Sequence, residues 1–243
     1  MPKFSDASSF PHPSLANEDG VVAVGGFPSP SALIDAYTHG IFPWPMGDLP
    51  LLWFSPDPRF VFQPNEVHLP KSLKKSIRRL NYSVTADQEF RRVIEECARV
   101  PRPEQDGTWI TTDMMNGYTA LHQLGYAHSI EVWSDGILVG GLYGLSFGSG
   151  FFGESMFSHA TDASKIGFMT MVAHLHQWGF HFIDCQVHTD HLERFGAYHI
   201  PRDEYLAWLV DALEAPTKKA PWLFSLSPKD AYLYLRDVSV SQS

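Results

Sequence analysis

Cysteine, long apolar runs and positive charge are all scarce in this chain of 243 residues. Its two cysteines, Cys97 and Cys185, supply neither a disulfide framework nor the four thiolates of a structural zinc site. The longest apolar stretch, residues 136–147, is interrupted by glycine and serine and is shorter than the ~20 residues of a membrane-spanning helix. The N-terminus lacks the apolar core of a signal peptide. We therefore expect a cytoplasmic protein with no membrane segment.

Acidic residues outnumber basic ones, because 18 Lys and Arg stand against 27 Asp and Glu and give a net charge of −9. That sum argues against a nucleic-acid partner. Five of the cations, however, fall within residues 71–79, which contain no acid and leave a net charge of −14 for the rest of the chain. A cationic patch on an acidic protein indicates a local phosphate-binding site. On charge alone, a solvated helix face is an equally good interpretation.

The first 65 residues differ in composition from the rest, because eleven of the 18 prolines fall there together with many aromatic residues. Such dense proline excludes long helices and central strands. One short helix is predicted over residues 31–39, capped by Ser29 or Ser31 and ended by Gly40. We interpret residues 1–65 as a small ordered N-terminal domain that packs on a larger domain, residues 66–243.

The larger part shows helical and strand periodicities in turn. In residues 71–80, Leu73, Ile77 and Leu80 share one side of a helix. Turn sequences separate three apolar, β-rich runs that read as antiparallel strands. The order of elements favours an α+β fold, a mixed sheet flanked by helices. The helices are predicted over residues 71–80, 87–99, 113–124, 164–178 and 203–213, with a short one from Asp190, and the strands over 129–133, 137–148, 150–155 and 180–187.

Three common kinds of site are disfavoured. The chain has 12 histidines, but they lack metal-ligand spacing: His174 and His176 are two apart on a helix and so do not face each other. We predict no metal. Ser155 follows Gly-Glu as in a nucleophile elbow but lacks the second glycine. The glycine-rich run of residues 140–150 opens no helix and so is a weak dinucleotide signal.

Acids at strand ends are the remaining candidates for chemistry. Glu154 closes the third strand, and Asp184 lies within an apolar strand. Alternation places Asp184 and Gln186 on the same face of that strand. A buried acid is costly unless paired, and such positions often have perturbed pKa values. The residues alone slightly favour a structural hydrogen-bonding pair.

Short motifs in a fixed order give the chain a resemblance to a known family, the leucyl/phenylalanyl-tRNA–protein transferases. They run from about residue 20 to about residue 210, nearly the whole chain. The motifs are GIFPWP (40–45), WFSPDPR (53–59), GTWIT (107–111), LHQLGYAHSIEVW (121–133), LVGGLYG (138–144), FFGESMFS (151–158), ASK (163–165), DCQ (184–186) and GAYHIPR (196–202).

This resemblance implies an enzyme that transfers Leu, Phe or Met from aminoacyl-tRNA to the N-terminal Arg or Lys of an acceptor protein. The product is marked for degradation by the N-end rule. It implies no cofactor, neither ATP, metal nor CoA, because the tRNA ester is already activated. It also implies a small N-terminal domain and a C-terminal domain similar to the N-acetyltransferase (GNAT-like) fold.

The resemblance also implies roles for the strand-end residues. Asp184 and Gln186 are expected to be a catalytic pair, in which Asp184 polarises Gln186 and the Gln186 carbonyl oxygen draws a proton from the attacking amine. Whether this pair acts as a base or only orients the amine is open. Glu154 is expected to bind the acceptor amine or the reacting end of the aminoacyl-adenosine.

Binding residues follow from the same resemblance. Trp44 and Trp109 are expected to stack on the terminal adenosine of the tRNA. The basic helix is expected to contact the tRNA acceptor stem through Lys71, Lys74, Lys75, Arg78 and Arg79. An apolar pocket for the Leu or Phe side chain is expected from Leu142, Phe151, Phe168, Met171, Leu175 and Ile183.

Three positions depart from the family pattern: Phe54 replaces a frequent Trp, His159 an Arg and Phe195 a Leu. Two other functions compete with the transferase. An acyl-CoA N-acyltransferase would need a glycine-rich loop opening a helix, which residues 158–165 do not supply. An RNA-binding module would explain the basic helix but not the placement of Glu154, Asp184 and Gln186. Nothing in the sequence demands more than a monomer.

Overall fold

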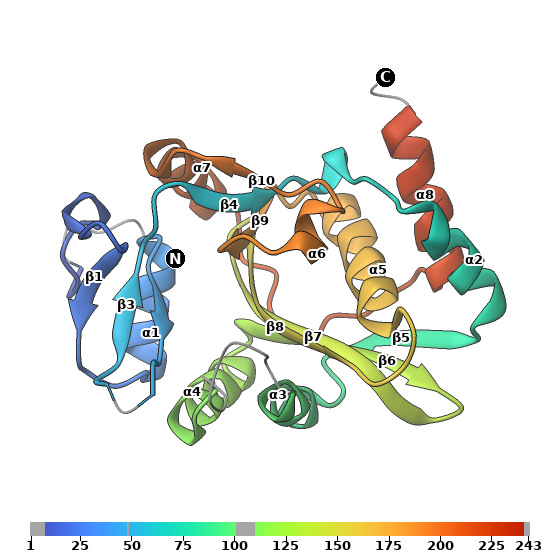
Figure 1. The fold of residues 1–243 in the computed structure, drawn as a ribbon, viewed down its shortest axis with the longest axis horizontal. Coiled ribbons are helices and arrows are strands. Elements are labelled where there is room, and N and C mark those ends of the chain that lie inside the picture. Colours follow the sequence, from blue (N-terminus) through green and yellow to red (C-terminus); the bar gives the residue numbers. More distant parts are fainter. Residues whose placement is uncertain (1–7, 48, 101–109, 241–243) are drawn as a thin grey trace.

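The N-terminal part combines one helix with a small antiparallel sheet. A computed structural model describes residues 8–47, 49–100 and 110–240 (Figure 1). The helix α1 (Pro30–Thr38) is capped by the Ser29 hydroxyl, which accepts a hydrogen bond from the Ala32 amide at 3.2 Å. Gly40 ends this segment at φ +76°, a value that glycine adopts without strain. The small sheet has the order β1-β3-β2, formed by β1 (Val21–Val24), β3 (Leu52–Phe54) and β2 (Phe42–Trp44).

The larger part is built on a seven-stranded sheet with the order β10-β4-β9-β8-β7-β6-β5. The strands β8 and β9 pair in parallel, and the other neighbours pair antiparallel. The predicted α+β fold with a mixed sheet flanked by helices is therefore confirmed. The strands are β4 (Arg59–Phe62), β5 (Tyr82–Ala86), β6 (Ala127–Ser134), β7 (Ile137–Phe147), β8 (Gly150–Ser158), β9 (Phe182–Gln186) and β10 (Tyr198–Ile200).

Helices cover both faces of this sheet (Figure 1). One face carries α3 (Phe90–Arg99) and α4 (Thr112–Gln123), and the other carries α5 (Ala163–Gln177) with α2 (Lys71–Arg79) and α8 (Pro228–Val240) outside it. The short α6 (Asp190–Glu193) follows β9. Within the part of the chain that the structure describes, no helix is long and apolar enough to cross a membrane.

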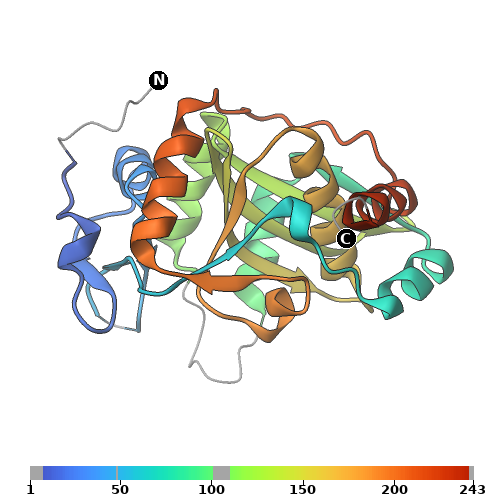
Figure 2. The ribbon, with the colours of Figure 1, turned by 90° about the horizontal axis from the view of Figure 1, so that it is seen from above.

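The N-terminal part shares its core with the larger part. Leu33, Phe42 and Trp53 belong to the same cluster of buried residues as Phe152 in the large sheet. The helix α7 (Arg202–Glu214) lies between the two parts (Figure 2). Its Leu206 packs so closely on Gly40 that a Cβ atom added to Gly40 would lie 2.7 Å from Cδ2 of Leu206. The division at residue 65 stays a prediction, and β4, which precedes that residue, pairs within the large sheet.

Several sequence predictions need correction. The helix predicted from Asp87 begins at Phe90, because Asp87 lies at φ +58°, outside the helical region. The edge strands β5 and β10 and the strand β4 were not predicted. The C-terminal helix α8 was not predicted either. Because β4 lies inside the large sheet, between β10 and β9, the expectation that residues 1–65 contain no central strand is wrong.

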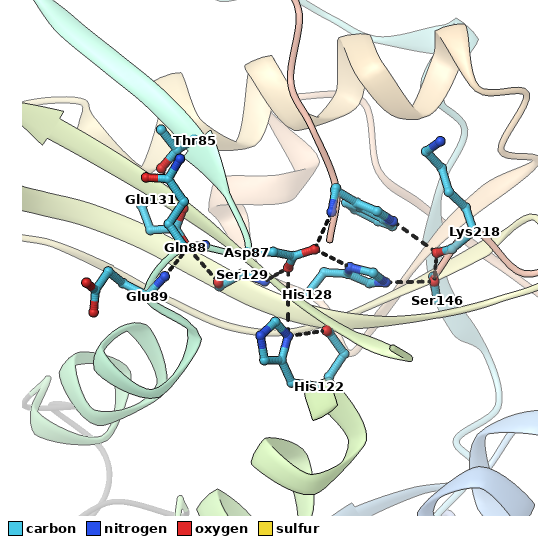
Figure 3. Close-up of polar contacts among 12 residues, drawn as sticks. Thr85, Asp87, Gln88, Glu89, His122, His128, Ser129, Glu131, Ser146 and Lys218 are labelled. Atoms are coloured by element: carbon cyan, nitrogen blue, oxygen red, sulfur yellow. Dashed lines mark hydrogen bonds and ion pairs between the residues drawn. The ribbon is translucent and has the colours of Figure 1, made fainter. Parts of the chain in front are cut away.

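A buried polar network ties the C-terminal segment to the sheet (Figure 3). The Asp87 carboxylate contacts Nδ1 of His128 at 2.9 Å and accepts the Trp222 amide at 2.6 Å. Nε2 of His128 lies 3.0 Å from the Ser146 hydroxyl, which lies 3.1 Å from the Lys218 carbonyl oxygen. This has the order of a Ser-His-Asp triad, but His128 and Ser146 are fully buried and the Trp222 ring stacks on His128 at 3.7 Å. No substrate reaches the serine, so the network serves the fold.

Candidate functional site

A cavity of about 240 Å³ lies beside the middle of β8 and the C-terminal end of β9, next to α5 and α6. Its walls are mostly apolar, and its polar groups include the side chains of Glu154, Asp184 and Gln186. Glu154 does not close its strand as predicted, because β8 continues to Ser158. The remaining lining residues are Trp44, Leu142, Tyr143, Phe151, Gly153, Ser155, Met156, Phe168, Met171, Ile183, Cys185, Val187, Thr189, His191 and Leu192. A concave apolar site with a few converging polar groups is typical of a ligand pocket.

The Glu154 carboxylate is held by three side chains from three other elements. Its Oε1 accepts the Tyr37 hydroxyl at 2.6 Å and the Gln186 amide nitrogen at 2.7 Å, and its Oε2 accepts the Tyr118 hydroxyl at 2.8 Å. The two tyrosine oxygens lie 2.7 Å apart. Tyr37 comes from α1 and Tyr118 from α4, so Glu154 joins the N-terminal part, the helices and the sheet.

This environment raises the pKa of Glu154 toward neutral pH. Burial raises the pKa of Glu154 to about 7, although the hydrogen bonds from Tyr37, Tyr118 and Gln186 lower it. Burial, reinforced by the charge of Glu154, raises the pKa of both tyrosines well above their ordinary value. The tyrosines therefore remain protonated donors, and Glu154 can gain or lose a proton near neutral pH.

Asp184 is paired with a buried arginine from the neighbouring strand. Its carboxylate accepts Nε of Arg59 at 2.8 Å and Nη2 of Arg59 at 2.6 Å, and both residues are fully buried. It also accepts the Tyr205 hydroxyl at 2.9 Å and the backbone amide of Gln186 at 2.9 Å. A bidentate ion pair of this kind fixes the orientation of the carboxylate and compensates its negative charge.

Arg59 is enclosed by aromatic rings and a backbone carbonyl. The guanidinium carbon lies 4.7 Å from the centre of the Phe42 ring and 4.4 Å from that of Tyr205. Nη1 donates to the Gly40 carbonyl oxygen at 3.3 Å. Burial alone would lower the pKa of Arg59, but the adjacent Asp184 outweighs it and raises the pKa, so the guanidinium stays charged.

Gln186 completes the site through an unusual backbone conformation. Its φ of +65° lies in the left-handed region, which is uncommon for residues other than glycine, and such conformations cluster at functional sites. Asp184 contacts its backbone amide, while its side-chain amide nitrogen points to Glu154. The expectation that Asp184 acts on the side chain of Gln186 therefore needs refinement: the contact runs through the main chain.

Most of the predicted pocket residues meet in this cavity. One predicted pocket residue is not part of it: Leu175, although fully buried, does not line the cavity, because it lies one further turn along α5 from Met171. Trp109 lies outside the described residues. The predicted residues that do line the cavity are Trp44, Leu142, Phe151, Phe168, Met171 and Ile183.

Four basic side chains of α2 face solvent. Lys74, Lys75, Arg78 and Arg79 are exposed and together line a shallow surface depression, while Leu73 is buried against the core. Among the described residues, no salt bridge involves these four cations. Lys71 is the first residue of the helix. This basic face lies at the opposite end of the molecule from the N-terminal part (Figure 1).

One surface group has metal-ligand chemistry. His188, Asp190 and Glu193 place ligand atoms within 4.8 Å of one another, but all three side chains are exposed. Exposed acidic groups of this kind are common without an ion, and the prediction of no metal stays a prediction.

The residues that sequence reasoning missed are those that hold the two acids. Arg59 ends the WFSPDPR motif, so the motif itself was a signal that could have found it. Tyr37 and Tyr118 lie 81 residues apart on separate helices, and no local pattern marks either. Tyr205 is likewise identified only by its contacts with Arg59 and Asp184.

Comparison with known proteins gives consistent matches over most of the chain. Residues 61–210 match the family described as leucyl/phenylalanyl-tRNA protein transferase, and residues 27–57 match the N-terminal domain of that family. A leucyl/phenylalanyl-tRNA–protein transferase from Myxococcus xanthus is 53% identical over 213 residues, covering 88% of this chain and 91% of the relative. One from Stutzerimonas stutzeri is 52% identical over 219 residues, covering 89% of this chain and 96% of the relative.

The buried ion pair predicts a large effect of a small substitution. Asp184→Asn leaves the Arg59 guanidinium buried without its counter-ion, so we expect the free energy of unfolding to fall by about 3–5 kcal/mol. Glu95→Gln is the control, because its pair with Arg91 is exposed and is expected to contribute no more than about 0.5 kcal/mol. Urea unfolding followed by tryptophan fluorescence measures both. Equal, small losses would contradict the anchoring role of Asp184.

Proposed function

This chain belongs to the leucyl/phenylalanyl-tRNA protein transferase family, and we propose that it transfers Leu, Phe or Met from aminoacyl-tRNA to the N-terminal Arg or Lys of acceptor proteins. Its relatives are named for aminoacyl transfer from tRNA to protein. The donor amino acids, the basic acceptor and the marking of the product for N-end rule degradation are the finer parts of the proposal. We propose that it acts in the cytoplasm as a monomer and needs no cofactor.

The single observation that carries the proposal is the cavity with Glu154 and Gln186 at its polar side. Its volume of about 240 Å³ is below the ~300–1,000 Å³ of pockets for larger ligands, so it suits one amino-acid side chain. Phe168 and Met171 from α5 and Leu142 and Ile183 from the sheet line it. Apolar walls of this kind accept Leu, Phe and Met and separate near neighbours by roughly 1–3 kcal/mol per methylene.

The aminoacyl ester would then lie at the mouth of the cavity. We assign to Trp44, which lines the cavity, the stacking of the terminal adenosine, a contact worth about 1–3 kcal/mol per base. Trp109 has the same proposed role. In this arrangement the ester carbonyl lies near the polar groups of Glu154 and Gln186.

The acceptor is proposed to approach as a positively charged N-terminus. Glu154 offers a carboxylate beside the cavity, and charge-assisted hydrogen bonds make a carboxylate the natural partner of an ammonium group. The net charge of −14 outside the basic helix also favours a basic acceptor residue.

The reaction is aminolysis of an ester. The neutral α-amine attacks the aminoacyl carbonyl, a tetrahedral oxyanion forms, and the ribose 3′-hydroxyl leaves. Because an N-terminal amine has a pKa of about 7.7–8.0, correct positioning of the two reactants can supply much of the catalysis. Asp184 would support this geometry by fixing the backbone of Gln186.

Two broader features accompany this proposal. The larger part is proposed to have the N-acetyltransferase (GNAT-like) fold, with the 3′ end of the tRNA in the place of an acyl-CoA. The basic face of α2, with Lys71, Lys74, Lys75, Arg78 and Arg79, is proposed to contact the phosphates of the acceptor stem. Such contacts are independent of sequence and sensitive to salt.

A transfer assay tests the proposed function directly. Phe-tRNA carrying labelled phenylalanine is mixed with a protein that begins with Lys or Arg, without ATP or CoA, and label in the protein is measured. We expect incorporation, and no incorporation into the same protein beginning with Asp. Binding of the tRNA without transfer would support an RNA-binding module, and a requirement for CoA would support an acyl-CoA N-acyltransferase.

The basic face predicts a specific salt dependence. Lys74→Gln/Lys75→Gln should weaken binding of Phe-tRNA and lower the slope of log K against log salt concentration by about 1.5–2, because each phosphate contact contributes about 0.9. Arg91→Gln/Arg99→Gln is the matched control, since it removes two cations from α3, on the other face of the sheet. A filter-binding series over salt concentration measures both slopes. Equal slopes in the two double variants would refute the tRNA contact at α2.

A further inference from the structure

Glu154, Tyr37 and Tyr118 form a closed ring of oxygen atoms beside the cavity. Three contacts join them: 2.6 Å from Tyr37 to Oε1 of Glu154, 2.8 Å from Tyr118 to Oε2 of Glu154, and 2.7 Å between the two hydroxyls. Each distance is that of an O–H···O hydrogen bond. Both tyrosines are fully buried, so the ring lies on the protein side of the cavity wall.

The number of protons in this ring depends on the state of Glu154. Each tyrosine hydroxyl supplies one proton, so two protons serve three contacts when Glu154 is ionised. If both hydroxyls donate to the carboxylate, their own 2.7 Å contact holds no proton. One proton added to Glu154 lets each of the three residues donate once, so that every contact of the ring holds a proton. The ring is therefore built to take up one proton.

The other acid of the site is unsuited to this task. Four donors already point at the Asp184 carboxylate: Nε and Nη2 of Arg59, the Tyr205 hydroxyl and the Gln186 amide. A proton on Asp184 would have to displace one of these donors and leave Arg59 without its charge partner. The amide of Gln186 is too weak a base to keep a proton and can only orient the amine.

We propose that Glu154 takes the proton from the α-ammonium group of the acceptor, and that Tyr37 and Tyr118 are positioning residues that share this proton around the ring. This rests on the proposed aminoacyl transfer and assigns the base within it. Asp184 and Gln186 then orient the amine, with the Gln186 amide nitrogen on Glu154 and its carbonyl oxygen directed away from Glu154.

The protons balance in this scheme. An ammonium group that becomes a peptide N–H gives up two protons. The first passes to Glu154 and later to solvent, which frees the electron pair for attack on the ester carbonyl. The second proton passes from the attacking nitrogen to the ribose 3′-oxygen as the ester C–O bond breaks, which releases the 3′-hydroxyl. The carboxylate of Glu154 is restored at the end of each turnover.

The surroundings of Glu154 keep its protonation within the useful range. Tyr143 on β7 raises the pKa of Tyr37 and Tyr118. Asp184 on β9 adds to the cost of negative charge on Glu154, and Arg59 on β4 is directed to Asp184. The resulting pKa of about 7 is close to the 7.7–8.0 of an N-terminal amine, so transfer of the proton between them is nearly balanced.

The pH dependence of Glu154→Gln tests the proposal. A glutamine completes the ring as the protonated acid does, so the fold is retained, but it cannot accept a proton. We expect transfer of Phe to an Arg-initiated peptide to fall by about 5- to 10-fold at pH 6.5, where only about 3–6% of N-terminal amines are neutral. The deficit should nearly vanish by pH 9, where the amine is already neutral. A deficit that stays constant from pH 6.5 to 9 would overturn the proposal.

Tyr37→Phe and Tyr118→Phe give a second, independent readout. Each removes a hydrogen bond that lowers the pKa of Glu154, so the acidic limb of the pH–rate profile should move to higher pH by about one unit. Tyr198→Phe is the control, because its hydroxyl donates to Gln63 away from the cavity, and its profile should match the unmodified protein. Superimposed profiles for all four proteins would also overturn the proposal. Absence of transfer by the unmodified protein would instead count against the proposed function.

Discussion

The buried pair of Arg59 and Asp184 is the interaction on which the rest of the site depends. Because desolvation costs several kcal/mol per ion, a fully buried ion pair is stable only when hydrogen bonds and packing hold both side chains in place. Here the partners come from the Gly40 carbonyl, the Phe42 ring, the Tyr205 hydroxyl and the Gln186 amide. The N-terminal part, α7, β4 and β9 must therefore all be in place before the pair is stable.

This arrangement separates two acids that the sequence presents as similar. Asp184 is committed to Arg59 and holds the backbone of Gln186 in its left-handed conformation. Glu154 has only neutral donors, and burial leaves its proton affinity near that of the amine it is proposed to serve. Two carboxyl groups in different environments thus have different tasks, one of geometry and one of proton transfer.

The sequence predicted the features that depend on local pattern. Capping and terminating residues located α1, the helical pattern located α2, α4 and α5, and the turns located the antiparallel strands β6, β7 and β8. It missed β4, because a strand buried throughout has no alternation, and β5, whose side chains are only partly covered. The partners of the acids were missed for another reason. Tyr37 and Tyr118 meet Glu154 only through tertiary packing, which no spacing along the chain encodes.

The central claim is that Glu154 is the carboxyl group of this site that titrates near neutral pH. It can be measured by ¹³C NMR of the protein labelled at the side-chain carboxyl of glutamate, with Glu154→Gln to assign the resonance. We predict that the Glu154 resonance titrates with a pKa of about 7. Titration at the ordinary glutamate value of about 4.3 would contradict the account, because Glu154 would then be too weak a base for the acceptor amine.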